Sequence, residues 1–228
     1  GVPVEWAEGD VLDPASLAAA FTGVDTVYHL AGIISIMPDG DDMMRRVNVE
    51  GTRNVLAAAR GAGVRRLVYT SSIHAFKPAP HGVVVDESLP FDPEHAMGAY
   101  DHTKAEASLE VLQAARDGLD AVIVAPTGVI GPHDFRTSEL GALIRSWLQP
   151  KTELLIDGRY DFVDVRDVVK GEMLAAEKGR PGEVYILSGE QRHLVQMMLT
   201  VKQMLGLPVK VLTIPLRWWS FGPFWRHE

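Results

Sequence analysis

Short runs of β-branched residues alternate with longer amphipathic runs along this chain, and the alternation limits the folds that it can adopt. Extended segments are predicted at residues 2–6, 25–30, 66–70, 119–124, 183–187 and 209–213, with a short one near 162. Helices are predicted at residues 13–21, 42–60, 99–116, 138–148, 165–177 and 194–205. Such an order is typical of β-α-β units built around a mostly parallel sheet. The sequence therefore predicts an α/β protein.

The composition argues against several classes of partner. The formal charge is −8, from 22 basic and 30 acidic residues, and neither sign forms a long block. A phosphate backbone requires a basic surface, so no nucleic-acid partner is expected. The chain has no cysteine, which excludes disulfides and thiolate metal sites. Without disulfides, a cytoplasmic location is the default. The histidines lack the spacing of metal ligands, so we expect no metal.

The end of the chain is rich in aromatic residues, namely Trp218, Trp219, Phe221, Phe224 and Trp225. They could form a membrane-surface anchor or a buried segment. No polybasic face accompanies them, so the buried segment is favoured. No stretch approaches the roughly 18 to 20 apolar residues that span a bilayer. We expect no membrane partner.

The strongest chemical signal is the segment Tyr100-Asp-His-Thr-Lys104. It falls in a predicted helix, where residues four apart share one face and the ammonium can approach the phenol. A nearby cation stabilises the phenolate and lowers a tyrosine pKa that starts near 10. Such a tyrosine can donate or accept a proton near neutral pH. The same spacing arises by chance on many helices, so the pair needs support from other segments.

Other segments supply that support in order along the chain. Thr70-Ser71-Ser72 ends a predicted strand, with Ser72 28 residues before Tyr100, and a proline-rich segment at 71–97 is predicted to be a long functional loop. The remaining motifs are Gly9 to Asp13, Leu30-Ala31-Gly32, Asn48 with its neighbours, Pro126 to Pro132 and Asp161 to Val168. In these motifs the chain resembles the extended short-chain dehydrogenase/reductase family over nearly its whole length.

The resemblance implies a catalytic triad. Tyr100 would be the general acid/base, Lys104 would lower its pKa and bind the nicotinamide ribose, and Ser72 would bind the reacting oxygen. Ser71 is the alternative to Ser72, since the motif could be displaced by one residue. Asn48 would support the active site from the helix behind it.

The resemblance also implies a cofactor, NAD or NADP, and the strand whose following residue normally decides between them is not in this sequence. The implied cofactor-binding residues are Asp10, Val11, Leu30, Ala31, Gly32, Thr70, Ser71, Tyr100, Lys104, Pro126, Thr127, Gly128 and Val129. The candidates for substrate contacts are His74, His133 and Arg136.

The family's fold is a Rossmann-like, doubly wound parallel sheet with a small C-terminal substrate lobe. We predict that residues 1–132 form a partial dinucleotide-binding domain and that 133–228 form a mixed substrate-binding lobe. No Gly-x-Gly-x-x-Gly turn occurs in the sequence, so the fold is expected to lack its first β-α units. A homodimer formed through the helices at 42–60 and 99–116 is implied by the resemblance alone.

Three functions remain open. The Ile-His-Ala-Phe segment after Ser72, and Tyr160 before Asp161, depart from sugar-epimerase patterns, although Arg159 is adjacent. These departures favour a carbonyl reductase or alcohol dehydrogenase that acts on a small-molecule substrate. A nucleotide-sugar epimerase is the alternative within the family. The third is an inactive fragment or a cofactor-sensing protein, against which the presence of both Tyr100 and Lys104 argues.

Overall fold

The computed structural model describes residues 3–34, 42–80, 83–149 and 152–215, which belong to two compact units. The first unit contains the chain as far as Pro126 together with Val168–Leu187. The second contains Thr127–Asp167 and the chain from Ser188 onward. The sequence analysis predicts a single boundary after residue 132, whereas these units are discontinuous. The dinucleotide-binding and substrate-binding roles of the two parts stay predictions.

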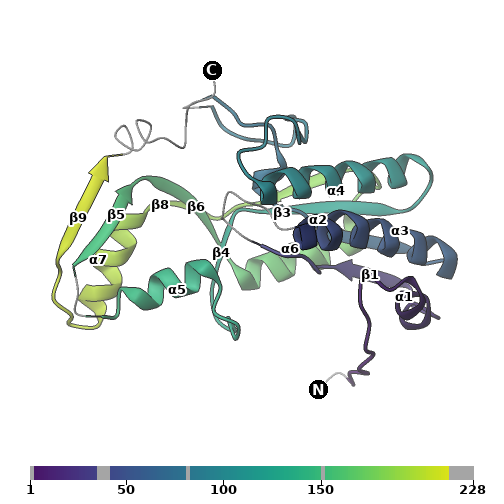
Figure 1. Cartoon of the computed structure of the whole chain (residues 1–228), viewed down its shortest axis with the longest axis horizontal. Helices are drawn as coiled ribbons and strands as arrows, with labels where there is room; N and C mark the ends of the chain where they lie inside the picture. Colours follow the sequence, from purple (N-terminus) through teal and green to yellow (C-terminus); the bar gives the residue numbers. More distant parts are fainter. Residues whose placement is uncertain (1–2, 35–41, 81–82, 150–151, 216–228) are drawn as a thin grey trace. The chain divides into compact units, whose positions relative to one another are not determined.

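A four-stranded parallel sheet is the centre of the first unit (Figure 1). Its strands, in sheet order, are β1 (Thr26–His29), β2 (Arg66–Thr70), β3 (Ala121–Pro126) and β7 (Val184–Leu187). In the register of this sheet, Leu67 pairs with Val27 on one side and Ala121 on the other. Strands that follow one another in sequence order form one half of a doubly wound sheet. The predicted α/β fold with a parallel sheet is confirmed.

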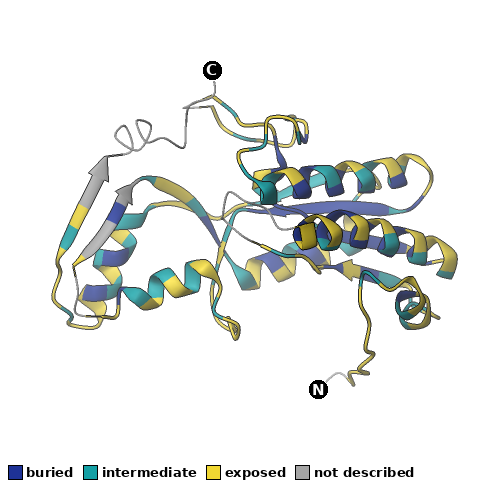
Figure 2. Cartoon of the chain, in the orientation of Figure 1, coloured by how far each residue is buried: buried dark blue, intermediate teal, exposed yellow. Residues whose placement is uncertain are grey.

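Helices cover both faces of this sheet. They are α1 (Pro14–Ala20), α2 (Asp42–Arg45), η1 (Arg46–Glu50), α3 (Gly51–Ala62), η2 (Ile73–Ala75), α4 (Ala99–Arg116) and the part of α6 (Val165–Lys178) that begins at Val168. Successive residues of a strand point to opposite faces. Leu67 and Tyr69 therefore pack in the cluster that includes α3 and α4, whereas Val68 packs with Ala175 of α6. Figure 2 shows the buried stripes along α3 and α4 and the buried strand β3.

The helix predicted at 42–60 contains a π turn. It consists of α2, η1 and α3, and it ends beyond the predicted boundary, at Ala62. Gly63 then takes a left-handed conformation with φ of 69°, which closes the helix. A π turn inserts one extra residue into the helical repeat, and such turns are frequent at functional sites. The inserted turn contains Asn48, which is 1% exposed.

The start of the chain departs from the prediction. Residues 3–10 have no regular structure, and Val4 and Trp6 are 70% and 92% exposed, so the strand predicted at 2–6 is wrong over its described part. An extended segment needs a neighbouring strand to take its backbone hydrogen bonds. No strand in the described ranges pairs with it. By contrast, α1 begins as predicted, with the Asp13 carboxylate accepting a hydrogen bond from Ala15 N at 3.0 Å.

The described part of the second unit contains two small sheets and two helices. Strands β4 (Gly128–Ile130), β6 (Arg159–Asp164) and β8 (Glu190–His193) form one sheet, and β5 (Glu153–Asp157) and β9 (Val211–Pro215) form the other. The helices α5 (Glu139–Ser146) and α7 (Leu194–Met204) belong to the same unit. Its core includes Trp147, Leu155 and Met198, all nearly inaccessible. The sequence does not predict β4, β5 or β8. Strand β8 has the polar sequence Glu-Gln-Arg-His, and only its pairing with β6 makes it a strand.

The long loop and the aromatic end of the chain are the other segments that the sequence singles out. The loop predicted at 71–97 is irregular in its described part apart from η2 and an antiparallel bridge between Phe76 and Phe91. The aromatic segment at 218–225 lies outside the described residues. Across the described ranges, every helix is too short or too polar to cross a membrane.

Candidate active site

Helix α4 carries Tyr100 and Lys104 one turn apart near its first residues. It begins at Ala99, after Gly98 in an extended conformation. Tyr100 is partly buried, and Lys104 is only 6% exposed. Ser72 follows the end of β2, and its hydroxyl lies near enough to the Tyr100 phenol to lower the pKa of that group. The structure thus brings the three predicted triad residues together at the carboxyl end of β2.

The environment of Tyr100 opposes ionisation of its phenol. Burial raises the pKa of Tyr100 above its ordinary value, the Ser72 hydroxyl lowers it, and the Asp101 carboxylate raises it further. The sequence predicts a lowered Tyr100 pKa from the neighbouring ammonium, and that prediction is wrong for this structure. Burial outweighs the stabilising contacts because desolvation penalises a charged phenolate.

The Lys104 ammonium binds groups on β2. Its Nζ donates to the Thr70 carbonyl at 2.7 Å and to the Tyr69 hydroxyl at 3.3 Å, and it lies 4.8 Å from the centre of the Tyr69 ring. Burial lowers the pKa of Lys104 to about 8. The ammonium is therefore mostly protonated at neutral pH, although it holds its proton less tightly than a lysine in water does.

The two serines after β2 have different partners. The Ser71 hydroxyl lies 2.7 Å from that of Ser108, inside the packing of α4, and Ser108 in turn donates to the Lys104 carbonyl. The Ser72 hydroxyl contacts Tyr100 and also accepts a hydrogen bond from His74 N at 3.2 Å. The geometry therefore favours Ser72 over Ser71 as the residue beside the phenol.

Asn48 connects the turn after β1 to the start of α4. Its Oδ1 accepts from Ile33 N at 2.8 Å, and its Nδ2 donates to the Ile33 carbonyl and to Thr103 Oγ1, both at 3.0 Å. Thr103 Oγ1 donates to the carbonyl of Tyr100. Asn48 thus supports the Tyr100 turn from behind, as the resemblance implies.

The turn after β1 has the space that a cofactor would need. Leu30, Ala31 and Gly32 are exposed. A Cβ added to Gly32 would lie 3.2 Å from Asn48 Oδ1 and 3.8 Å from Lys104 Nζ. A side chain here would fill the space above both polar groups, whereas glycine leaves the backbone open to a ligand. The residues of this turn therefore fit a cofactor that lies against the backbone.

Asp10 and Val11 form a turn that is tied to the helices. Asp10 Oδ1 accepts from Leu12 N at 2.8 Å, and Asn54 Nδ2 donates to the Val11 carbonyl at 2.9 Å. A Cβ on Gly51 would lie 2.7 Å from the Val11 side chain, so the turn and α3 are in close contact. One Asp10 oxygen is used in the local turn, and its cofactor-binding role stays a prediction.

Thr70 links the site to the opposite face of the sheet. Its hydroxyl donates to Glu172 Oε1 on α6 at 2.9 Å, while its carbonyl accepts from Lys104. Burial raises the pKa of Glu172, and the Thr70 hydroxyl opposes that shift.

The implied cofactor-binding residues Pro126 to Val129 belong partly to each unit. Pro126 ends β3 in the first unit, and Thr127, Gly128 and Val129 belong to the second. Thr127 Oγ1 donates to Asp161 Oδ1 at 2.7 Å. A Cβ on Gly128 would lie 3.0 Å from the Asp161 carbonyl, so glycine permits the pairing of β4 with β6.

Of the predicted substrate residues, His74 belongs to the first unit and lies beside Tyr100. Its Nδ1 is 3.5 Å from Asp101 Oδ1, and its ring centre is 6.4 Å from that of Tyr100. Burial raises the pKa of Asp101, and the positive charge that His74 can carry opposes the shift.

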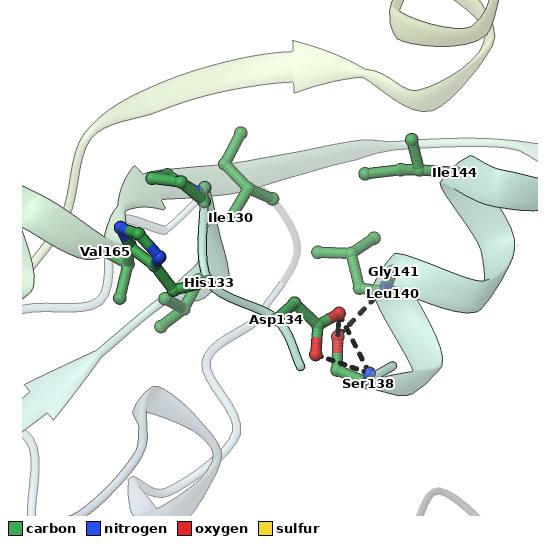
Figure 3. A pocket seen from close by; sticks show the side chains of 11 residues that line it. Ile130, His133, Asp134, Ser138, Leu140, Gly141, Ile144 and Val165 are labelled. Atoms are coloured by element: carbon green, nitrogen blue, oxygen red, sulfur yellow. Dashed lines mark hydrogen bonds between the residues drawn. The ribbon is translucent and has the colours of Figure 1, made fainter. Parts of the chain in front are cut away.

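A pocket of about 250 Å³ lies within the second unit and is lined mostly by apolar side chains, with His133 among them (Figure 3). His133 has a left-handed backbone with φ of 73°, which is uncommon for a residue with a side chain. Asp134 accepts hydrogen bonds from the backbone and hydroxyl of Ser138, as the dashed lines in Figure 3 show. Arg136 is exposed and does not line this pocket.

Three buried polar residues next to the triad are not predicted from the sequence. Tyr69, His29 and Thr52 are 1%, 4% and 1% exposed. His29 Nε2 lies 2.9 Å from Thr52 Oγ1, and the His29 and Tyr69 rings are 5.4 Å apart. Burial and the Lys104 charge lower the pKa of His29 to about 4, so the imidazole is neutral. The signal for His29 and Tyr69 in the sequence is a polar side chain at an inward position of a strand, whereas Thr52 lies on α3.

Comparisons with known proteins agree with this geometry. The profile of the NAD dependent epimerase/dehydratase family matches residues 2–188. Sterol demethylase protein B of Methylococcus capsulatus is 38% identical, over 95% of this chain and 66% of its own length. A Synechocystis protein provisionally named dihydroflavonol 4-reductase is 35% identical, over 100% of the chain and 67% of its own length.

Solved structures show the same fold. The crystal structure of gox2253 superposes with a TM-score of 0.86 at 34% identity, over 94% of this chain and 66% of that one. A nucleoside-diphosphate-sugar epimerase from Pseudomonas aeruginosa superposes with a TM-score of 0.78 at 24% identity, over 92% and 66%. The chain spans about two thirds of each of these relatives. It belongs to the NAD dependent epimerase/dehydratase family of extended short-chain dehydrogenases/reductases.

Proposed function

We propose that this chain is the catalytic part of an NAD(P)-dependent carbonyl reductase or alcohol dehydrogenase that uses Ser72, Tyr100 and Lys104. The observation that carries the proposal is the placement of the Ser72 hydroxyl beside the Tyr100 phenol, whose pKa it lowers, with the Lys104 ammonium held on β2 one helical turn from Tyr100. A proton donor, a second donor to the same oxygen and a nearby cation are the groups that carbonyl reduction requires.

Each side chain has a separate task in this mechanism. The cofactor, when bound, supplies the hydride. Tyr100 donates a proton to the carbonyl oxygen, and Ser72 donates a hydrogen bond that orients the same oxygen. The Lys104 ammonium stabilises negative charge that develops on the phenol. Positioned proton transfer of this kind accelerates reactions by roughly 10² to 10⁴-fold.

NAD or NADP would be held by backbone and small residues at the strand ends. The candidate residues are Asp10, Val11, Leu30, Ala31, Gly32, Thr70, Ser71, Pro126, Thr127, Gly128 and Val129, together with Tyr100 and Lys104. The open backbone at Gly32 is the feature that best fits such a ligand.

Reduction is favoured over sugar epimerisation by two observations. The segment after Ser72 departs from the epimerase pattern, and the Synechocystis relative at 35% identity is named a reductase. The Pseudomonas epimerase is similar at 24% identity, which supports the shared fold alone. Nucleotide-sugar epimerisation is the alternative that a product assay must exclude.

The test follows oxidation of NADH and NADPH with a panel of aldehydes and ketones. Net oxidation indicates a reductase, whereas an epimerase regenerates its cofactor in each turnover. We expect Tyr100→Phe to abolish turnover and Tyr28→Phe, at a half-exposed position on β1, to retain it. Near-full activity of Tyr100→Phe would contradict the assignment. Binding of reduced cofactor without any turnover would instead indicate a cofactor-sensing protein.

The wider proposal is a cytoplasmic homodimer that acts on a small molecule contacted by His74, His133 and Arg136. The face formed by α3 and α4 is the candidate dimer surface. It carries the ion pair between Arg53 and Glu110, at 2.6 Å. Light scattering of the purified chain tests the dimer, and a monomeric mass across the working concentration range would exclude it.

A further inference from the structure

The Lys104 ammonium is buried among neutral groups. In the described part of the chain, its partners are the Thr70 carbonyl and the hydroxyl and ring of Tyr69, and no carboxylate pairs with it. A buried charge without a counter-ion depends on hydrogen bonds and on the polarisable groups around it. The orientation of this ammonium is therefore determined by β2 rather than by an ion pair.

Tyr69 contributes two contacts of different kinds. Its hydroxyl accepts a hydrogen bond from Nζ at 3.3 Å, and its ring lies within cation–π distance at 4.8 Å. Thr70 accepts one further N–H of the ammonium. An ammonium has three donors, so this arrangement leaves one N–H for a ligand.

Packing behind Tyr69 holds its ring beside the ammonium. Thr52 Oγ1 donates to the Asn48 carbonyl at 2.7 Å, so it can only accept from His29 Nε2, which lies 2.9 Å away. The His29 ring in turn lies 5.4 Å from the Tyr69 ring. An ammonium has donors only, so the Tyr69 oxygen must present a lone pair to Lys104.

We propose that Tyr69 is a positioning residue for Lys104, and that the His29 ring, held by Thr52, keeps the Tyr69 ring in place beside the ammonium. The inference deepens the proposed function, and it rests on that function only for its kinetic arm. Asn48 belongs to the same chain of hydrogen bonds, because its carbonyl anchors Thr52 and its side chain supports the Tyr100 turn.

Within the described ranges, few groups can influence the ionisation of Lys104. They are His29 on β1, Tyr69 on β2 and Tyr100 on α4, while η1 and α3 present the neutral Asn48 and Thr52. Glu172 on α6 reaches the hydroxyl of Thr70, on the opposite face of the sheet. The Tyr69 hydroxyl is bonded to the Lys104 ammonium, so its removal should act most directly on the ionisation of Lys104.

The test measures titration of Lys104 by NMR, with carbon-13 at the lysine ε position and Lys104→Met to assign the signal. Tyr69→Phe retains the ring and the packing but removes the hydroxyl. A hydrogen bond to a charged group changes an equilibrium on the order of tenfold or more, so the Lys104 midpoint should fall by about one pH unit. Tyr28→Phe should leave the Lys104 midpoint unchanged.

The kinetic arm separates positioning from loss of structure. In Tyr69→Phe, the alkaline limb of kcat for carbonyl reduction should move to lower pH by the same amount, with activity recovering below it. A general structural defect would lower kcat equally at every pH. The titration needs no substrate, so a wild-type protein without reductase activity would refute the proposed function while the Lys104 midpoint still decides this inference. Coincident Lys104 titrations in wild type and Tyr69→Phe would overturn it.

Discussion

Replacing Lys104 with methionine should stabilise the fold while abolishing catalysis. The pKa of Lys104 falls from 10.5 in water to about 8 in the folded protein. The unfolded chain therefore binds the proton more tightly, and below pH 8 the folded state carries the full penalty of the buried charge. At about 1.4 kcal/mol per pH unit, that penalty is about 3 kcal/mol at pH 7. Methionine has a similar length and no charge, so Lys104→Met should recover much of it.

The pH dependence of folding stability follows from the same difference in Lys104 pKa between the folded and unfolded protein. Between pH 8 and 10.5 the folded protein has lost the Lys104 proton and the unfolded chain has retained it, so stability rises with pH. By pH 10 only about 1 kcal/mol of the penalty should remain. The stability advantage of Lys104→Met should therefore shrink as pH increases from 7 to 10.

Urea unfolding of wild type and Lys104→Met across this pH range measures the effect, because the difference between the two proteins cancels most other titrating groups. Lys178→Met, at an exposed position in the last turn of α6, is the matched control and should show no such trend. A constant difference between wild type and Lys104→Met from pH 7 to 10 would refute the argument that burial of the charge determines this stability.

Three further substitutions test other contacts. Ser72→Ala should lower kcat about 100-fold through loss of the donor to the reacting oxygen, whereas Ser71→Ala should chiefly lower the unfolding free energy, by about 1 kcal/mol, as measured by urea titration. Arg66→Met should destabilise the first unit by about 3 kcal/mol, because this buried guanidinium donates to three carbonyls at the end of α6 and pairs with a carboxylate; a loss below about 1 kcal/mol would contradict the reasoning. Gly189→Ala should cost about 2 to 3 kcal/mol, since its Cβ would lie 2.2 Å from a backbone carbonyl, while Gly61→Ala, with no atom within 4 Å, should gain about 0.5 kcal/mol. Equal melting temperatures of the Gly189→Ala and Gly61→Ala variants would contradict this steric explanation.

The sequence predicts the elements whose periodicity is local. The strand at 66–70 and the helix at 99–116 have the predicted bounds, because each combines a clear apolar pattern with a defined start and end. Strand β8 could not be predicted, since it depends on pairing with a strand nearly thirty residues away. The π turn around Asn48 is hidden for a similar reason, because tertiary contacts rather than local propensity stabilise its extra residue.

The candidate site is also only partly predictable from the sequence. The spacing of Tyr100 and Lys104 and the position of Ser72 follow from motifs, and the structure brings these residues together. The sign of the Tyr100 pKa shift does not follow, because it depends on burial by segments that are distant in sequence. Tyr69 is missed because a tyrosine in a buried strand is indistinguishable from a packing residue until its neighbours are known.

The two pKa shifts bear on the direction of the proposed reaction. A raised Tyr100 pKa keeps the phenol protonated at neutral pH, and carbonyl reduction requires a proton donor at this position. Lys104, with a pKa of about 8, still carries its charge at pH 7 and can stabilise the phenolate as it forms. Alcohol oxidation requires the opposite starting state, an ionised phenol, which burial disfavours. We therefore expect reduction to be fastest near or below neutral pH and oxidation to require a higher pH. An oxidation optimum below the reduction optimum would show that groups other than Tyr100 control proton transfer.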